Sequence, residues 1–314
     1  MPKPFMTYDQ QIQKLRDKHM VVPDVAYAKE LLHRYGYFAL ITGYKDLLKN
    51  PTTKNYRDGT TFNDIVAIYQ FDKRLRELTF HYLLLIEQNI RSLLSYAFCD
   101  IFGDQQSAYV SPQNYNTSTR NKTKEVNTLI NKYLNPLLTH QSNHPYIEHQ
   151  KTHHGNVPLW VLVNALTFGT LSKMYEYSKP QVQSAISREF QNINEPQLRQ
   201  ILEVLTDFRN KCAHNERLFT HRCAKHDIPD LLLHKKLGIA KNGNQYVCGK
   251  RDYFALVIAL RYLLPKPLFL KYKAALSSLI DKVIASNQQI SMTTLLSIMG
   301  FPANWKNITR YSRI

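Results

Sequence analysis

The feature that most constrains the fold is a long segment, residues 60–99, in which apolar side chains recur at helical spacing. These positions are Ile65, Ile68, Leu75, Leu78, Tyr82, Leu85, Ile86, Leu93 and Ala97. The polar run Thr60-Thr61-Phe62-Asn63-Asp64 stands where a helix of this kind needs its capping side chains. At about 1.5 Å per residue, an unbroken helix here extends on the order of 50 Å. We therefore predict one helix that crosses the whole domain.

The rest of the chain also predicts helices, separated by proline and by polar clusters. Residues 7–48 read as a helical hairpin, broken at Val22-Pro23-Asp24, with Asp24 capping the second helix. Further helices are expected over residues 126–138, 158–177, from 180, from 195 to the region of Arg209, 252–264 and 268–286. Residues 239–247 contain Asn-Gly and predict a small β-hairpin. The fold class is therefore all-α.

Two polar stretches stand apart from this pattern. Residues 111–124 are rich in Asn, Thr, Ser, Lys and Arg, which predicts a surface loop or insertion outside the core. Residues 140–156 contain five histidines and read as a solvated loop, because Pro145 interrupts any helix that would align them. The five are His140, His144, His149, His153 and His154. No cysteine or carboxylate completes a recognised ligand spacing, so we expect no metal there.

The charge balance points to an anionic partner. The chain of 314 residues has 41 Lys and Arg against 24 Asp and Glu, a formal net charge of +17. Nucleic acid is the leading candidate and a membrane surface is the rival. No stretch approaches the roughly 18 apolar residues of a spanning helix, and the start lacks the apolar run of a signal peptide. Four sparse cysteines favour reduced thiols, so we expect a cytoplasmic protein.

The most informative local sequence runs from Arg209 to Leu218 and places an arginine and a histidine with four residues between them, Arg209 and His214. Arg209 carries a permanent charge that can hold a phosphate through two parallel hydrogen bonds, whereas His214 can take or give a proton. Attack by a 2′-hydroxyl on a neighbouring phosphate uses both properties. A helix that ends in basic residues also favours this composition, so the spacing alone is a weak signal.

Other residues extend this candidate site. Glu87 and Arg91 are four apart on the long helix, where they either form a structural pair or lie across from the motif helix, with Glu87 orienting an arginine and Arg91 contacting phosphate. Residues expected to contact RNA are Lys211, Asn215, Arg217, Arg222 and Lys225. The residues Cys212, His214, His221, Cys223 and His226 suit zinc by type. Because their spacing matches no zinc-finger pattern, we expect buried thiols rather than a metal site.

Several stretches resemble the Abi-like family of bacterial abortive-infection proteins, of the AbiD/AbiF type, whose members belong to the HEPN superfamily of helical ribonucleases. They are residues 3–15, 35–44, 62–72 with Leu75-Arg76, 86–91, 158–160, 168–172 and 299–305. The resemblance implies a HEPN-like helical bundle. It divides the chain into an N-terminal helical segment (1–58), a core (59–225) with a polar insertion at about 104–156, and a C-terminal helical extension (226–314).

The same resemblance implies an activity. The superfamily's catalytic arginine and histidine fall on Arg209 and His214, and its polar residue falls on Asn210. It implies a metal-independent endoribonuclease toxin that needs no cofactor and leaves a 2′,3′-cyclic phosphate. It also implies a symmetric homodimer with a basic cleft, held off in some relatives by a small noncoding RNA. Two other classes remain open, a non-catalytic RNA-binding protein and a zinc-stabilised interaction protein.

Overall fold

The computed structural model describes residues 4–139 and 143–311, which form helices and one small hairpin, so the all-α prediction is confirmed. The first seven helices are α1 (Tyr8–Arg16), α2 (Val25–Tyr35), α3 (Phe62–Phe102), α4 (Gln106–Tyr109), α5 (Arg120–Thr128), α6 (Asn135–Thr139) and α7 (Pro145–His154). The remaining eight are α8 (Leu159–Leu162), α9 (Phe168–Tyr177), α10 (Pro180–Ser187), α11 (Glu195–Ala213), α12 (Leu232–Lys236), α13 (Tyr253–Leu263), α14 (Lys266–Ser286) and α15 (Met292–Ile298).

Short irregular turns complete the chain. Single turns of 3₁₀ helix cover Lys45–Leu47, Pro112–Asn114, Val163–Ala165 and Trp305–Thr309, and π-helical turns cover Phe38–Thr42 and Leu129–Leu134. The predicted hairpin is present as β1 (Lys241–Asn242) paired antiparallel with β2 (Gln245–Tyr246). The helices α12 and α15 were not anticipated, because each is too short to show a clear periodic pattern.

The helix α3 is the structural axis of the molecule and confirms the prediction of one long helix. It has 41 residues, and Thr61 and Asp64 cap its start by exchanging hydrogen bonds between side chain and backbone. It ends at Gly103, whose φ of 89° is accessible to glycine at little cost. The neighbouring elements pack around this axis.

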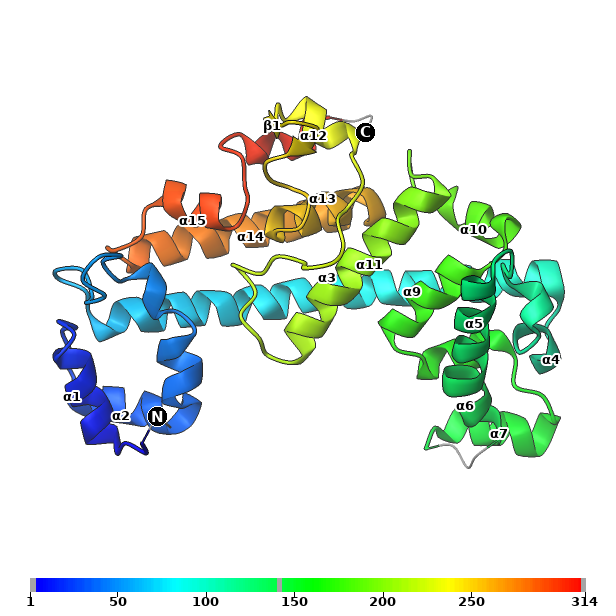
Figure 1. Ribbon diagram of the computed structural model, residues 1–314, viewed down its shortest axis with the longest axis horizontal. Coiled ribbons are helices and arrows are strands. Elements are labelled where there is room, and N and C mark those ends of the chain that lie inside the picture. Colours follow the sequence, from blue (N-terminus) through cyan, green and yellow to red (C-terminus); the bar gives the residue numbers. More distant parts are fainter. Residues whose placement is uncertain (1–3, 140–142, 312–314) are drawn as a thin grey trace.

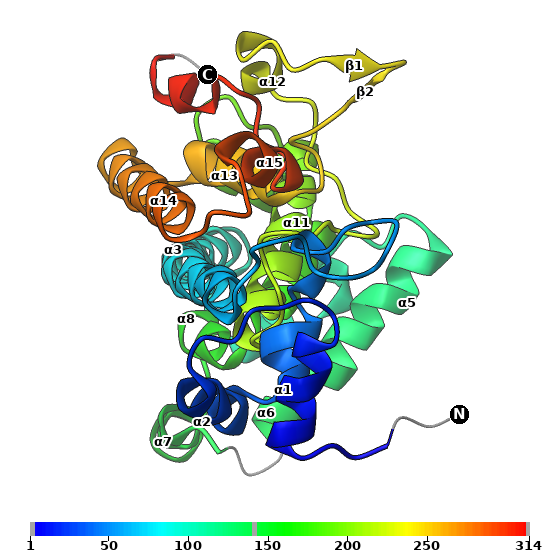
Figure 2. The same ribbon diagram turned by 90° about the vertical axis from the view of Figure 1, so that its left-hand side faces the viewer.

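The other helices surround α3 unevenly. The helix α14 runs along one side of α3, and α11 crosses it near the middle (Figures 1 and 2). The pair α1 and α2 lies at one end, and α4 to α7 lie at the other, so the molecule has the outline of an arch (Figure 1). The C-terminal end of α11 lies at the inner side of this arch (Figure 1). No helix in the described ranges is long and apolar enough to cross a membrane.

The predicted N-terminal hairpin is confirmed. Asp24 accepts a hydrogen bond from the backbone N–H of Tyr27 at 2.9 Å and so caps α2. Leu15 of α1 and Leu32 of α2 are buried where the two helices pack together. Burial of this apolar face, rather than helix propensity, stabilises helices as short as these.

The prediction of a solvated loop over residues 140–156 is wrong for most of that stretch. Pro145 begins α7 instead of interrupting it, because a proline in the first turn loses no backbone hydrogen bond. Ile147 is fully buried, whereas the rings of His149 and His153 stack on each other at the surface with centroids 4.3 Å apart. His140 lies outside the described residues. His149, His153 and His154 therefore occupy exposed positions of a helix, and His144 precedes its first residue.

Two other boundaries differ from the prediction. Residues 111–124 are not wholly a surface loop. Tyr115 is buried and its hydroxyl donates a hydrogen bond to the carbonyl oxygen of Tyr109, and the helix α5 begins at Arg120. The single helix expected over residues 158–177 is broken, because the side chain of Thr167 accepts a hydrogen bond from the N–H of Thr170 and starts α9 anew. Local side-chain caps, which compete with helix continuation, account for this break.

Candidate functional site

The motif residues lie where α11 ends, and the sequence explains why it ends there. The N–H of Glu216 bonds the carbonyl of Lys211 at 3.0 Å, and that of Asn215 bonds the carbonyl of Cys212 at 3.2 Å. This pair of bonds is a Schellman motif, which requires a left-handed residue just after the helix cap. Asn215 takes that conformation, with a φ of 54°. A residue predicted to contact RNA therefore also has a local role in stopping the helix.

Because α11 stops at Ala213, His214 forms the helix cap and does not continue the helix. Its backbone N–H bonds the carbonyl of Asn210 at 2.9 Å, and both side chains are exposed. On a straight helix, Arg209 and His214 would point about 140° apart. His214 keeps this helical bond to the last turn of α11, and the chain leaves the helix direction directly after it, at Asn215.

Two side chains of α3 contact the guanidinium group of Arg209. Its Nε atom lies 3.3 Å from Oε2 of Glu87 on α3, and its guanidinium carbon lies 5.8 Å from the centre of the Phe80 ring. The Glu87 side chain is 1% exposed and that of Arg209 is 24% exposed. Within the described residues, no protein group pairs with the two terminal nitrogens of Arg209. The arginine is thus oriented through Nε while the end of its planar fork remains free.

Arg91 also pairs with Glu87, and two of its three guanidinium nitrogens, Nε and Nη2, bond protein groups. Its Nε and one terminal nitrogen donate to the carbonyl oxygens of Val163 and Leu166, each at 3.1 Å. Arg91 therefore connects α3 to the turn before α9. Of the two arginines on Glu87, Arg209 is the better placed to meet a phosphate.

A second acidic residue of α3 holds the segment that follows the motif. Asp72 is fully buried and accepts hydrogen bonds from the backbone N–H groups of Leu218 and Phe219, from the hydroxyl of Tyr44, and from Arg76. Burial raises the pKa of the Asp72 carboxyl, and the charge of Arg76 opposes that rise. The same carboxyl group thus satisfies four donors and fixes the chain leaving the motif.

Sequence reasoning missed Asp72, Arg76 and Tyr44. The available signal was the spacing of Asp72 and Arg76, four apart on α3 like Glu87 and Arg91. Nothing in that spacing indicates backbone N–H groups as partners, because those donors carry no side-chain signature. The contact exists because α11 packs against α3 and the chain after it passes Asp72.

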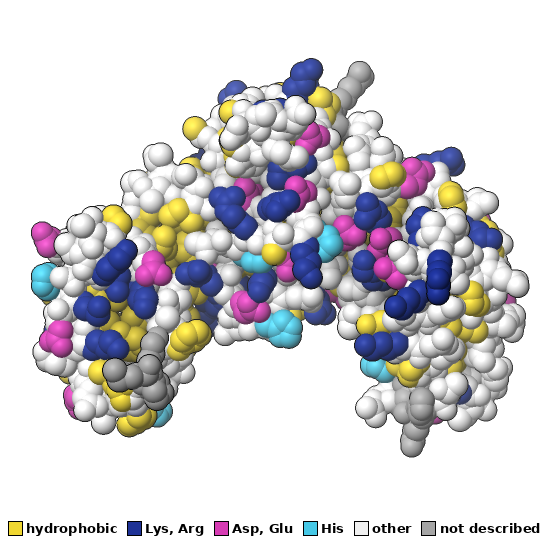
Figure 3. All heavy atoms as spheres, in the orientation of Figure 1, with side chains coloured by type: hydrophobic (Ala, Val, Ile, Leu, Met, Phe, Trp, Pro, Cys, Tyr) yellow, Lys and Arg dark blue, Asp and Glu magenta, His cyan; other side chains and the backbone are white. Residues whose placement is uncertain are grey.

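The predicted RNA-contacting residues near the motif have the following neighbours. Lys211 pairs with Glu216 at 2.5 Å, Arg217 donates to the carbonyl of Gly43, and Arg222 lies 3.5 Å from Asp252. Lys225 is exposed. Figure 3 shows lysine and arginine side chains scattered over this face, with acidic ones among them and the hollow of the arch below. The charge of +17 is thus not gathered into one continuous patch on this face.

Comparison with family models gives one match, to the family described as Abi-like protein, over residues 30–220. The matched region is more than half of the chain and includes α3, α11 and the whole motif segment. This chain belongs to the Abi-like protein family. No curated protein and no solved structure matches it significantly.

The region matched by the family model is shorter than the range of residues, 3 to 305, over which the sequence resembles the family. The opening stretch 3–15 and the stretch 299–305 lie outside the region matched to the Abi-like family, whereas Asp72, Glu87 and the motif lie inside it. Both buried acidic residues that contact the motif segment of this Abi-like chain are therefore within the family region.

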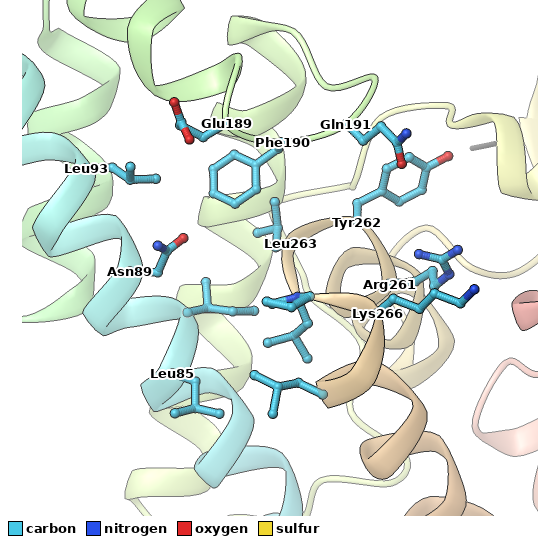
Figure 4. A pocket seen from close by; sticks show the side chains of 14 residues that line it. Leu85, Asn89, Leu93, Glu189, Phe190, Gln191, Arg261, Tyr262, Leu263 and Lys266 are labelled. Carbon is cyan, nitrogen blue, oxygen red and sulfur yellow. The ribbon is translucent and has the colours of Figure 1, made fainter. Parts of the chain in front are cut away.

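A separate pocket of about 550 Å³ lies between α3, residues 189–191 and the junction of α13 with α14. Figure 4 shows Leu85 and Asn89 of α3 facing Leu263 and Lys266 across it. Leu85 and Glu87 are two residues apart, about 200° around the helix, so this pocket opens on a different side of α3 from Arg209. The pocket is not part of the motif site of this Abi-like protein.

Proposed function

We propose that this Abi-like protein is a metal-independent endoribonuclease of the HEPN type, with Arg209 and His214 as its catalytic residues. The proposal rests on how the guanidinium group of Arg209 is oriented and exposed. A buried carboxylate, Glu87, holds the guanidinium through Nε and leaves its terminal nitrogens free, in the same helix turn from which His214 emerges. An arginine so oriented needs little further ordering to bind a phosphate.

Each residue has a defined part in the proposed reaction. His214 takes the proton of the 2′-hydroxyl or gives one to the leaving 5′-oxygen. Arg209 stabilises the negative charge that develops on the phosphate. Asn210, exposed one residue after Arg209, orients the substrate or the imidazole. The 2′-oxygen bonds phosphorus as the bond to the 5′-oxygen breaks, which leaves a 2′,3′-cyclic phosphate and a 5′-hydroxyl.

The biological setting proposed is an abortive-infection or toxin-antitoxin system, in accord with the family. A nuclease of this kind endangers its host, and a small noncoding RNA that occupies the same site is a fitting inhibitor. Two copies that pool their motifs would form a wider basic cleft, and we propose a symmetric homodimer on that ground. The surplus of 17 positive charges supports a polyanionic partner in either case.

The direct test is cleavage of RNA with a chelator present. His214→Ala should lower the rate by at least about 10²-fold, the loss typical of removing a general acid or base, with RNA affinity nearly unchanged. Arg209→Lys should behave almost like Arg209→Ala, because lysine keeps the charge and loses the planar fork. The matched control is His33→Ala, which removes an exposed histidine on α2 and should cleave like the wild type.

Two results decide against the proposal. Equal rates for His214→Ala and the wild type would remove His214 from the reaction. A wild type that binds RNA without cutting it, and loses binding in Arg209→Ala, would instead show a non-catalytic RNA-binding protein.

A further inference from the structure

A cluster of three potential metal ligands lies next to the motif and outside the proposed reaction. Asp207 of α11, His221 and Cys223 place a carboxylate oxygen, an imidazole nitrogen and a thiol sulfur within 4.8 Å of one another. Nε2 of His221 lies 2.8 Å from Oδ2 of Asp207. We propose that these three side chains bind a zinc ion, which joins the end of α11 to the segment that follows the motif.

The donor set selects the metal. A thiolate and an imidazole are preferred by zinc, whereas magnesium and calcium take oxygen ligands. Ligand distances of about 2.0–2.3 Å in a tetrahedron separate neighbouring donor atoms by roughly 3.5 Å. The pair Asp207 and His221 therefore has to open by less than about 1 Å to admit the ion. Three protein ligands leave the fourth position to water.

The electrostatic surroundings of Cys223 favour a cation. The carboxylates of Asp207, Asp227 and Asp252 lie near the buried Cys223 thiol. Such a group of negative charges attracts a divalent ion, which deprotonates a coordinating thiol. Two of the three carboxylates also have a cation beside them: Arg222, 54% exposed, lies 3.5 Å from Asp252, and Arg251 pairs with Asp227.

The same three residues do not form a nucleophilic site. Cys223 is 2% exposed, and both it and His221 hydrogen-bond Asp207 rather than each other. A cysteine nucleophile needs a base that contacts its sulfur and an approach for substrate. Metal binding is therefore the chemistry that this arrangement supports.

The position of the cluster defines its role. Asp207 lies two residues before Arg209, and the ring of His221 packs edge-on against Phe208 with centroids 5.0 Å apart. The N–H of Cys223 bonds the carbonyl of Arg251 at 2.8 Å, just before α13. A zinc ion here would join α11 to the segment of His221 and Cys223, which this backbone bond connects in turn to the start of α13. It is a structural ion, takes no part in the proposed cleavage, and stands or falls independently of it.

The sequence obscured this cluster. Of the five residues first considered, only His221 and Cys223 come together in it. Cys212 lies close enough to Asp72 and Arg76 for both to affect its thiol pKa, and His226 pairs with Glu203 at 3.2 Å. The third ligand, Asp207, lies on α11 two residues before the motif and 14 residues before His221, so no short ligand spacing appears in the chain.

The test uses the full-length protein, with cobalt(II) as a spectroscopic probe and zinc as the competitor. The wild type should bind cobalt with an intense near-ultraviolet sulfur-to-metal band, and zinc should abolish that band. Cys223→Ser should lose the band and bind zinc more than about 10²-fold more weakly. The matched control Cys248→Ser removes a half-buried thiol outside the cluster and should keep both properties.

A second measurement does not depend on a variant. A strong chelator should lower the Tm of the wild type as isolated, and added zinc should restore it, because a metal that binds only the folded state stabilises it. A wild type without a cobalt–sulfur band, or a band that survives in Cys223→Ser, would overturn the proposal. An unchanged Tm after removal of all metal would also overturn it.

Discussion

Two buried acidic residues of α3, Asp72 and Glu87, have the same spacing to an arginine and opposite consequences for the motif segment. Asp72 pairs with Arg76 and Glu87 with Arg91, fifteen residues apart and so about 22 Å along the helix. Asp72 bonds Tyr44, Arg76 and the backbone of Leu218 and Phe219. Glu87 bonds two arginines, of which Arg209 is partly exposed.

The difference shows how one helix serves both stability and chemistry. At the Asp72 end the carboxylate accepts four hydrogen bonds and Arg76 is 5% exposed, so this end is closed to solvent and holds the chain. At the Glu87 end the exposed fraction rises to 17% for Arg91 and 24% for Arg209. That end keeps a cation oriented and accessible. We expect the first pair to control folding and the second to control cleavage.

The largest effect should come from Asp72→Ala. It leaves Arg76 buried without its partner and removes the acceptor for two backbone N–H groups, which should cost about 3–5 kcal/mol of unfolding free energy. Glu30→Ala is the matched control, because Glu30 and Arg34 form an exposed pair with the same spacing, worth at most about 1 kcal/mol. Chemical denaturation measures both, and equal losses would remove the distinction between buried and exposed pairs.

A smaller effect on stability and a clear effect on cleavage are expected for Glu87→Gln. A neutral amide cannot balance two guanidinium groups, so Arg209 should turn toward solvent and lose its orientation. Misplacement of a catalytic group lowers rates by about 10- to 100-fold, which single-turnover cleavage measures. Because Arg91 and Arg209 can both reach water, the loss of stability should be less than for Asp72→Ala. Wild-type cleavage by Glu87→Gln would show that Arg209 needs no such support.

The smallest effect concerns the basic residues beyond the motif. RNA affinity should fall with salt by about 0.7 log units per phosphate contact for each tenfold rise in salt, if the RNA is single-stranded. Replacing Arg217 and Arg222 together by alanine should flatten that slope, since each contact releases counterions. The double variant Lys29→Ala with Arg34→Ala, in the N-terminal hairpin, is the control. An unchanged slope for the first variant would place the RNA surface elsewhere, with Arg120, Lys122 and Lys124 as the next candidates.

The parts of the molecule that sequence reasoning anticipated depend on local patterns. The long helix follows from its apolar spacing and the cap at Thr61, and the helix end near Arg209 from residues that favour a C-terminus. The prediction at Pro145 was wrong because a proline can either begin or interrupt a helix. Here it begins α7, whose Ile147 is buried in the core, and the sequence alone does not indicate that burial.

The parts that escaped prediction depend on distant contacts. Glu87 and Arg209 are 122 positions apart, and Asp72 lies 146 positions from Leu218. The sequence supported two interpretations of Glu87, a structural pair with Arg91 or a residue that orients an arginine across from the motif helix. It contained no signal for Asp72, whose partners are backbone groups, or for Asp207 beside His221 and Cys223.

The measurement that tests the central claim most directly is the chemistry of the cut ends. Purified protein is incubated with RNA in the presence of a chelator, and the product termini are identified by mass spectrometry. Attack by the 2′-hydroxyl, assisted by His214 and Arg209, predicts 2′,3′-cyclic phosphate and 5′-hydroxyl ends, and no cut at a position that carries a 2′-deoxyribose. Ends with a 3′-hydroxyl and a 5′-phosphate, or cleavage at the deoxy position, would contradict the account.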